Sequence, residues 1–193
     1  MTKSKKNNPR TTYVGFDMDG VIIDHTLPKI RLAEKYGFSI TPEQTPSDIL
    51  RNIMPEKIRK EFQHMLYSDS KIALSAPMMR GVKPALREIT KRGIPFALIT
   101  RRRDPAVTIQ LLEKHGLWPN FFHEKNTFFV LAPEDKNTKA IELGLTHYLD
   151  DELKVLKALT DVENRFLFDK YGVFSEDDLY KKVFSWQHFL THL

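Results

Sequence analysis

Two carboxylates stand two positions apart in the stretch GFDMDGV, residues 15–21. Asp17 and Asp19, placed where an apolar strand ends, could share one metal ion, and Mg²⁺ prefers such hard oxygen ligands. A carboxylate can also attack phosphorus and form an aspartyl-phosphate that water then hydrolyses. The same residues could instead form only a strand followed by an Asp-Gly turn. Taken alone, the motif leaves both interpretations open.

Two further apolar segments end on polar side chains. Residues 95–99 lead to Thr100, and residues 146–149 lead to Asp150 and Asp151. Ligands of open parallel sheets bind beyond the carboxyl ends of the strands, so we expect these groups to converge with the first carboxylate pair. A carboxylate and a phosphate repel each other, and a metal ion with hydroxyl or cationic donors would offset that repulsion. Thr100 can supply the hydroxyl, and a lysine can supply the cation.

The elements that would position these groups alternate between strands and helices. Most of the predicted strands are apolar at both alternating positions, as expected of strands covered on both faces. Asp104 followed by Pro105 predicts the start of one helix, and Ser175 with Asp178 predicts the start of another. This alternation predicts an α/β fold with a Rossmann-like parallel sheet of about five strands and helices on both faces. The predicted strands are residues 13–16, 95–99, 127–131, 146–149 and 165–168.

One region after the first strand breaks the alternation. It contains no convincing strand but has helical patterns over residues 27–36, 46–52 and 55–66. We therefore predict a small all-helical insertion. The predicted organisation is a disordered basic tail over residues 1–10, a core domain over 11–24 and 80–193, and a helical cap over 25–79.

Together, these motifs resemble the haloacid dehalogenase superfamily. The family's first motif is similar to DMDGV at residues 17–21, and its second is an apolar strand ending in Thr or Ser, like FALIT ending at Thr100. Its third is a lysine at the start of a helix, and its fourth is an acidic pair after an apolar strand, like YLDD at residues 148–151. All four occur in order within residues 12–168. The resemblance implies a Mg²⁺-dependent phosphatase with a cap over its active site.

The resemblance also implies a role for each acidic residue. Asp17 would be the nucleophile, and Asp19 would protonate the leaving oxygen and later deprotonate the attacking water. Mg²⁺ would be held by the side chains of Asp17 and Asp150 and by the backbone carbonyl of Asp19. Asp151 would help through a water molecule or an indirect hydrogen bond, and Thr100 would bind the phosphate.

The phosphate-binding lysine has three candidates. Lys136 is favoured by the family's spacing, since it precedes Gly144 by eight residues and opens the helix before the fourth strand. Lys139 is the main competitor, and Lys125 is a third choice. A lone lysine on a solvated helix face is the alternative interpretation for each.

Three consecutive arginines, Arg101, Arg102 and Arg103, directly follow Thr100. At least one of them should border the phosphate site, and Arg101 is the first candidate. Arginine suits a second phosphate or a carboxylate through paired hydrogen bonds. A solvated loop is the alternative. His25 lies on the predicted flap after the first motif, and a hydrogen-bonded or solvent-facing histidine is favoured there over substrate contact.

Asp19 also bears on the subclass. In the superfamily, dehalogenases lack an acid at this position and ATP-driven pumps carry Thr, so a phosphatase or a phosphomutase is favoured. Residues 166–168 and 183–186 loosely resemble the 5'-nucleotidase/deoxyribonucleotidase branch, which ranks nucleoside monophosphates first among small phosphate monoesters. Trp186 and Phe189 are expected to pack rather than to stack on a base. A sugar phosphomutase, a nucleic-acid end phosphatase and a catalytically silent binding protein of the same fold remain alternatives.

Composition limits these expectations further. The 193-residue chain has a net charge of +5 and contains no cysteine, which excludes disulfides and thiolate metal sites and fits a reducing cytoplasm. No apolar run reaches the ~20 residues of a membrane-spanning helix. The basic charge suits a phosphate ester or nucleic acid, but no nucleic-acid-binding motif is present. We therefore expect a cytoplasmic protein whose partner is a small phosphorylated metabolite.

Overall fold

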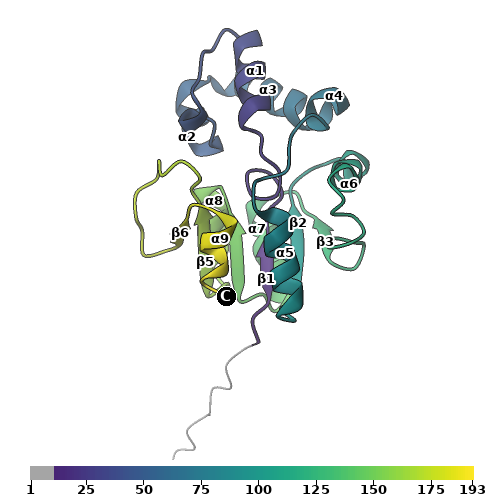
Figure 1. Ribbon diagram of the computed structural model, residues 1–193. Coiled ribbons are helices and arrows are strands. Elements are labelled where there is room, and N and C mark those ends of the chain that lie inside the picture. The colour runs from purple at the N-terminus through teal and green to yellow at the C-terminus, as the bar shows by residue number, and fades with distance from the viewer. Residues whose placement is uncertain (1–10) are drawn as a thin grey trace, which may run out of the picture.

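The computed structural model describes residues 11–193, so the predicted tail of residues 1–10 lies outside the described part of the chain. A parallel sheet forms the centre, with strand order β3-β2-β1-β4-β5-β6 (Figure 1). The predicted α/β fold is confirmed, and β6 adds a strand to the five predicted. The strands are β1 (Val14–Phe16), β2 (Phe96–Thr100), β3 (Thr127–Phe129), β4 (His147–Asp150), β5 (Asn164–Phe168) and β6 (Lys181–Val183).

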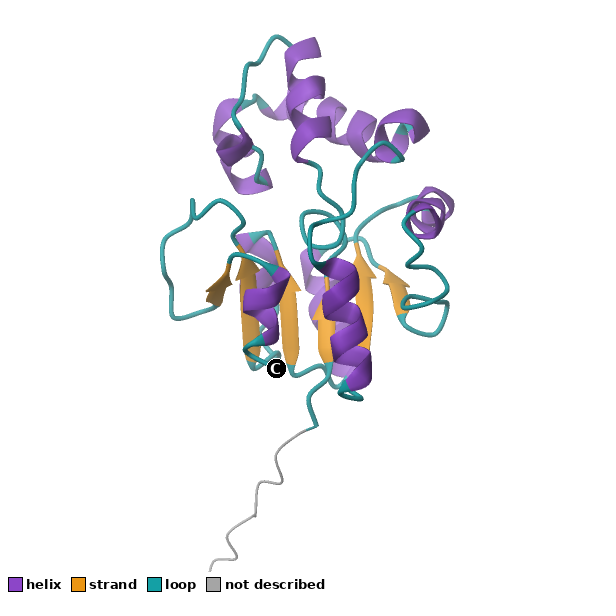
Figure 2. Ribbon diagram, viewed as in Figure 1, coloured by secondary structure: helices purple, strands orange, loops and turns teal. Residues whose placement is uncertain are grey.

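Helices cover both faces of the sheet, and each face has its own apolar core (Figure 2). Neighbouring residues of one strand alternate between the two cores: Leu98 belongs to the core under α5 and α9, and Ile99 to the core under α7 and α8. This arrangement explains why most of the strands carry apolar residues at both alternating positions. The covering helices are α5 (Val82–Lys91), α6 (Pro105–Lys114), α7 (Pro133–Leu143), α8 (Leu153–Ala158) and α9 (Trp186–Leu190).

Local signals in the sequence set several of these boundaries. The Asp104 carboxylate accepts hydrogen bonds from the amides of Ala106 and Val107, so α6 begins where it was predicted. Helix α7 ends at Gly144, whose φ of 68° places it in the left-handed region that favours glycine. Within residues 11–193, no helix is long and apolar enough to span a membrane.

The remaining helices lie together beyond the carboxyl ends of the strands (Figure 1). They have a small core of their own, which includes Leu32, Leu50, Phe62 and Leu66. Three of them match the helices predicted in the insertion, while the cap boundaries at residues 25 and 79 stay a prediction. These cap helices are α1 (Thr26–Lys35), η1 (Pro42–Gln44), α2 (Ser47–Ile53), α3 (Glu56–Ser68) and α4 (Ser70–Ala73).

The prediction that a helix begins at Ser175 is wrong. Residues 175–180 form a loop in which the Asp177 carboxylate accepts a hydrogen bond from the backbone amide two residues on. The Tyr180 hydroxyl donates to the Ser175 carbonyl at 3.0 Å, which turns the chain into β6. Aspartate and serine side chains favour such local bonds as readily as they cap helices, so the signal was ambiguous. The last helix, α9, begins later and is capped by Ser185.

Trp186 packs as predicted and connects α9 to the first strand. Its side chain is fully buried, with ring centroids 5.0 Å from Phe16 and 6.1 Å from Phe189. Its indole Nε1 donates to the carbonyl of Val21 at 2.9 Å. Val21 lies in the loop that follows Asp17, so Trp186 supports the loop that carries the first carboxylate pair.

Replacing this tryptophan should therefore weaken the whole core. We expect Trp186→Ala to lower the free energy of unfolding by about 3–5 kcal/mol, because it leaves a cavity and an unpaired carbonyl. Urea unfolding followed by circular dichroism measures this change. Phe184→Ala is the matched control, since Phe184 is 46% exposed, and it should cost about 1 kcal/mol or less. Equal losses in the two variants would contradict the packing role.

Candidate active site

Four of the predicted site residues meet at the carboxyl edge of the sheet. Asp17 follows β1, Thr100 ends β2 and Asp150 ends β4, and these three strands are neighbours in the sheet. Lys136 reaches them from α7 and donates from Nζ to Asp17 Oδ1 at 2.5 Å and to Asp150 Oδ2 at 2.8 Å. All four residues are buried. Residues separated by more than a hundred positions therefore form one polar cluster.

The two lysine candidates on α7 lie in different environments. Lys136 and Ala140, four residues apart, share the buried face of the helix. Lys139 is only partly buried, pairs with Glu142 and lies 5.1 Å from the ring centroid of Phe128. Burial would lower the pKa of Lys136, but the carboxylates of Asp150 and Asp17 outweigh burial and raise that pKa well above its ordinary value. Lys136 therefore stays charged inside the cluster.

Three carboxylates of this cluster fit a metal ion. Asp17, Asp150 and Asp151 each offer an oxygen, and these ligand atoms lie within 4.8 Å of one another. Burial raises the pKa of Asp17 to about 7 despite Lys136, and burial also raises the pKa values of Asp150 and Asp151. Lys136 thus does not neutralise all three acids, and a divalent cation would. An all-oxygen donor set suits Mg²⁺.

Gly20 lets the loop after β1 pass close to Asp151. Its φ is +84°, which L-residues with a side chain rarely adopt. A Cβ added at Gly20 would lie 2.1 Å from Asp151 Oδ2. The glycine of the first motif therefore makes room for a carboxylate of the fourth motif.

The side chain of Asp19 does not join the Lys136 cluster and instead interacts with Arg102 and His25. Arg102 donates from Nη2 to Oδ1 at 2.7 Å and from Nε to Oδ2 at 3.0 Å. His25 Nε2 lies 2.6 Å from Asp19 Oδ1. Burial alone would raise the pKa of Asp19, but the Arg102 guanidinium and His25 hold it well below its usual range. In this arrangement the Asp19 carboxylate is ionised and accepts hydrogen bonds.

Arg102 is the residue that sequence reasoning did not single out. It is buried, and its guanidinium lies 5.4 Å from the ring centroid of Tyr67 on α3. Its backbone amide donates to Thr100 Oγ1 at 3.3 Å. The run of three arginines carries no local signal that singles out the middle one. His25 is hydrogen-bonded, as the favoured interpretation predicted.

Arg101 lies at the edge of the cluster. Its guanidinium donates from Nη2 to Glu152 Oε2 at 2.5 Å, and Glu152 also pairs with Lys154 at 3.2 Å. Burial would lower the pKa of Arg101, but Glu152 and Asp17 raise it. Arg101 thus remains cationic beside Asp17, with its charge shared with Glu152.

A cavity of about 480 Å³ opens above Asp17, between the cap helices and the loop after β2. Asp17, Asp19 and Asp151 lie in its wall, whereas Thr100, Lys136 and Asp150 lie behind it. This cavity, called the cleft below, gives a small molecule access to Asp17.

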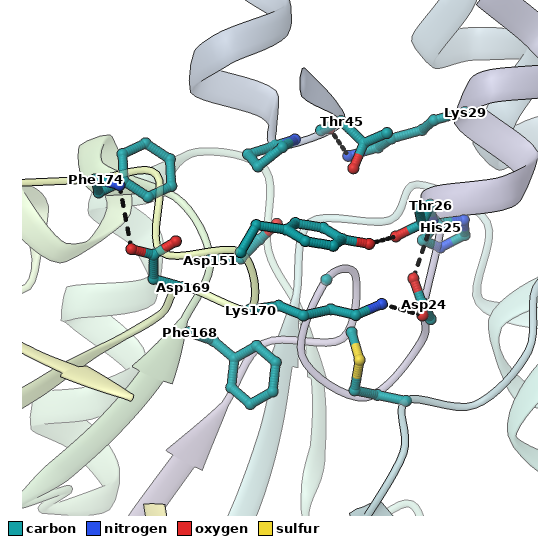
Figure 3. A pocket seen from close by; sticks show the side chains of 14 residues that line it. Asp24, His25, Thr26, Lys29, Thr45, Asp151, Phe168, Asp169, Lys170 and Phe174 are labelled. Atoms are coloured by element: carbon teal, nitrogen blue, oxygen red, sulfur yellow. Dashed lines mark hydrogen bonds and ion pairs between the residues drawn. The ribbon is translucent and has the colours of Figure 1, made fainter. Parts of the chain in front are cut away.

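A second, smaller pocket of about 40 Å³ lies where the cap meets the loop after β5 (Figure 3). Lys170 donates to Asp24 at 2.6 Å, and the hydroxyls of Thr26 and Tyr171 are 2.8 Å apart. Lys29 donates to the carbonyl of Thr45 at 2.9 Å. The first two contacts connect the start of α1 to the core and so help fix the position of the cap over the cleft.

Solved structures match the fold of this chain, whereas the comparisons by sequence find no match. No family model and no curated protein matches the chain. A haloacid dehalogenase-like protein of unknown function from Agrobacterium tumefaciens superposes with a TM-score of 0.64 at 16% identity, covering 94% of this chain and 97% of that one. The chain has the haloacid dehalogenase fold. The fold expected from the four motifs is thereby confirmed.

Two further structures with the haloacid dehalogenase fold match over similar lengths. A hydrolase of this family from Deinococcus radiodurans, which holds phosphate and sodium, has a TM-score of 0.61 at 13% identity, covering 95% of this chain and 94% of that one. A subfamily IA hydrolase from Geobacter sulfurreducens has a TM-score of 0.59 at 13% identity, covering 94% of this chain and 96% of that one. At these identities the comparisons establish the fold, while the chemistry rests on the residues of this chain.

The raised pKa of Asp17 predicts a pH-dependent stability in metal-free buffer. Folded Asp17 binds a proton more tightly than unfolded Asp17, whose ordinary pKa is 3.8. Its contribution to stability therefore falls as the pH rises from about 4 to about 7. We expect wild-type protein to lose roughly 2–4 kcal/mol relative to Asp17→Asn across this window, since one pKa unit corresponds to about 1.4 kcal/mol.

Urea unfolding of both proteins with a chelator, at half-unit steps of pH, measures this difference. The comparison is needed because burial lowers the pKa of His25, and that shift gives a slope of opposite sign in both proteins. Parallel stability profiles for wild type and Asp17→Asn would contradict the buried carboxyl cluster.

Proposed function

We propose that the protein is a magnesium-dependent phosphatase that hydrolyses a small phosphate monoester through an aspartyl-phosphate on Asp17. The observation that carries this proposal is the meeting of Asp17, Lys136, Asp150 and Asp151 in one cluster, of which Asp17 and Asp151 line a cleft. The phosphate bound by the Deinococcus hydrolase of the same fold adds support.

In the first step, a carboxylate oxygen of Asp17 attacks phosphorus and the ester P–O bond breaks. Lys136 donates to one oxygen of Asp17, Oδ1, so the second oxygen remains available. Lys136 also brings a positive charge to the phosphate, and Arg101 lies where it can add another. Thr100 accepts a hydrogen bond at Oγ1 from Arg102, which leaves its hydroxyl hydrogen free to donate to a phosphate oxygen.

Mg²⁺ held by Asp17, Asp150 and Asp151 would supply positive charge against the phosphate oxygens. Each of these acids is otherwise destabilised by burial beside the others. The same ion would therefore serve both folding and chemistry. The predicted ligand from Asp19 is its backbone carbonyl, which leaves its side chain free for Arg102 and His25.

In the second step, water attacks phosphorus, the Asp17–phosphate bond breaks and inorganic phosphate leaves. The ionised Asp19 carboxylate is in the state needed to take a proton from that water. Donation of a proton to the leaving oxygen in the first step needs the other protonation state. Arg102 and His25 oppose that state, so Asp19 must move away from them before it can act as an acid.

The direct test is phosphate release from a panel of nucleotides, sugar phosphates and an aryl phosphate. We expect release with Mg²⁺, none with chelator, and a loss of about a thousandfold or more in Asp17→Asn, because the nucleophile is removed. Asp178→Asn is the control, since Asp178 is exposed and lies outside the cleft. Full activity in Asp17→Asn, or in the presence of chelator, would refute the mechanism.

A further inference from the structure

The cap turns one face of α3 toward the cleft. Lys60, Gln63, His64 and Tyr67 recur at intervals of three and four residues, so they share one helix face, and all four line the cleft. Phe62 and Leu66, also on α3, are buried in the apolar core of the cap. Helix α3 thus presents its polar side chains to whatever lies above Asp17.

The opposite wall comes from the core. Arg101, Arg102 and Arg103, in the loop after β2, line it together with Lys154 of α8. The cleft is therefore bounded on both sides by side chains that donate hydrogen bonds and carry positive charge. Its volume of about 480 Å³ exceeds what one phosphate group fills, so the rest of the substrate must also lie between these walls.

Each acidic side chain that lines the cleft either has a hydrogen-bond or ion-pair partner within the protein or belongs to the catalytic cluster. Asp19 accepts from Arg102 and His25. Glu152 is shared between two cations of the opposite wall. The Asp104 carboxylate caps α6. Asp17 and Asp151 belong to the catalytic cluster.

Three basic side chains that line the cleft away from the catalytic cluster, Lys60, His64 and Arg103, have no buried acidic partner within residues 11–193. The part of the cleft that they line is called the outer cleft. Within residues 11–193, Arg103 and His64 form no ion pair. Lys60 pairs only with Glu56, one turn earlier on α3, and both side chains are at least 67% exposed. Such an exposed pair is weak and easily exchanged for another anion. The outer cleft therefore carries surplus positive charge several side chains away from Asp17.

From this imbalance, and resting on the proposed phosphatase function, we infer that the substrate carries a second anionic group besides the ester that Asp17 attacks. The second group is a phosphate or a carboxylate, bound between Lys60 and His64 of α3 and Arg103 of the opposite wall. Arginine binds either group through paired hydrogen bonds, lysine adds charge, and the histidine ring can donate a hydrogen bond. A neutral leaving group, by contrast, would leave these cations without a partner.

The test compares esters that differ only in the second group: a sugar monophosphate, the corresponding sugar bisphosphate, and a phosphorylated sugar acid. We expect wild-type kcat/KM to be at least tenfold higher for the two esters with a second anionic group than for the monophosphate. Raising the ionic strength should reduce that preference, because salt screens exposed charges. The better of these two esters identifies the second group as phosphate or carboxylate.

The double variant Lys60→Gln with Arg103→Gln should reduce the preference for the second anion to about twofold or less. The matched control is Lys71→Gln with Arg87→Gln, two exposed cations outside the cleft, and it should keep the wild-type preference. Equal kcat/KM for all three esters in wild type would overturn the inference, and so would an unchanged preference in the Lys60/Arg103 variant.

Failure of this inference is distinguishable from failure of the proposed function. An enzyme that hydrolyses the monophosphate with Mg²⁺ but shows no preference keeps the phosphatase function and loses the second-anion site. If no ester is hydrolysed, calorimetry of Asp17→Asn with the same three compounds tests the site by binding alone. At least tenfold tighter binding of an ester with a second anionic group than of the monophosphate supports the site, and equal affinities overturn it.

Discussion

The burial of like charges at the carboxyl edge of the sheet is the constraint on which the rest of the structure depends. Asp17, Asp150 and Asp151 approach within metal-binding distance of one another, and Lys136 pairs with only two of them, Asp17 and Asp150. Removing charged groups from water is costly unless they are paired and hydrogen-bonded. The fold must therefore hold these groups in place, and it does so by placing the three acids at or directly after the ends of β1 and β4 and Lys136 on α7. A cation bound there would repay part of that cost.

The surrounding elements can be understood as supports for this edge. Trp186 of α9 binds the loop that follows Asp17 from one side of the sheet, and α7 brings Lys136 from the other. Gly20 allows that loop to pass beside Asp151. Contacts from Lys170 and Tyr171 then fix the start of α1, so the position of the cap depends on the loop after β5. The cleft and its charges follow from these placements.

The sequence predicted the convergent part of the site well because each residue stood at the end of an apolar strand. Parallel strands bring such ends together whatever the intervening chain does. Lys136 could be favoured over Lys139 by spacing alone, and in the structure Lys136 is fully buried whereas Lys139 is only partly buried and pairs with Glu142. The third strand is two residues shorter than predicted. Val130 and Leu131 are apolar, but Val130 is only partly buried and Leu131 is exposed, so their apolar character did not indicate a buried strand.

Other features depended on contacts that no local pattern encodes. The interaction of Arg102 with Asp19 joins residues 83 positions apart, and three consecutive arginines give no local reason to choose the middle one. Strand β6 is short and begins with two lysines, so its apolar signal is weak. Ser175 and Asp178 satisfy a helix-start pattern, but the burial of Tyr180 and Val183 favours an extended chain. Tertiary packing overrode local propensity at that point.

The measurement that tests the central claim most directly is thermal unfolding with and without Mg²⁺ at pH 8, with NaCl added to match the ionic strength. At a Mg²⁺ concentration a hundredfold above the dissociation constant, binding should add about 2.7 kcal/mol of stability. For a chain of this size, that gain raises the midpoint by roughly 5–10 °C. We predict this rise in wild type and its loss in Asp150→Asn. An equal Mg²⁺ effect in both proteins, or none in wild type, would contradict the account of the carboxylate cluster as a metal site.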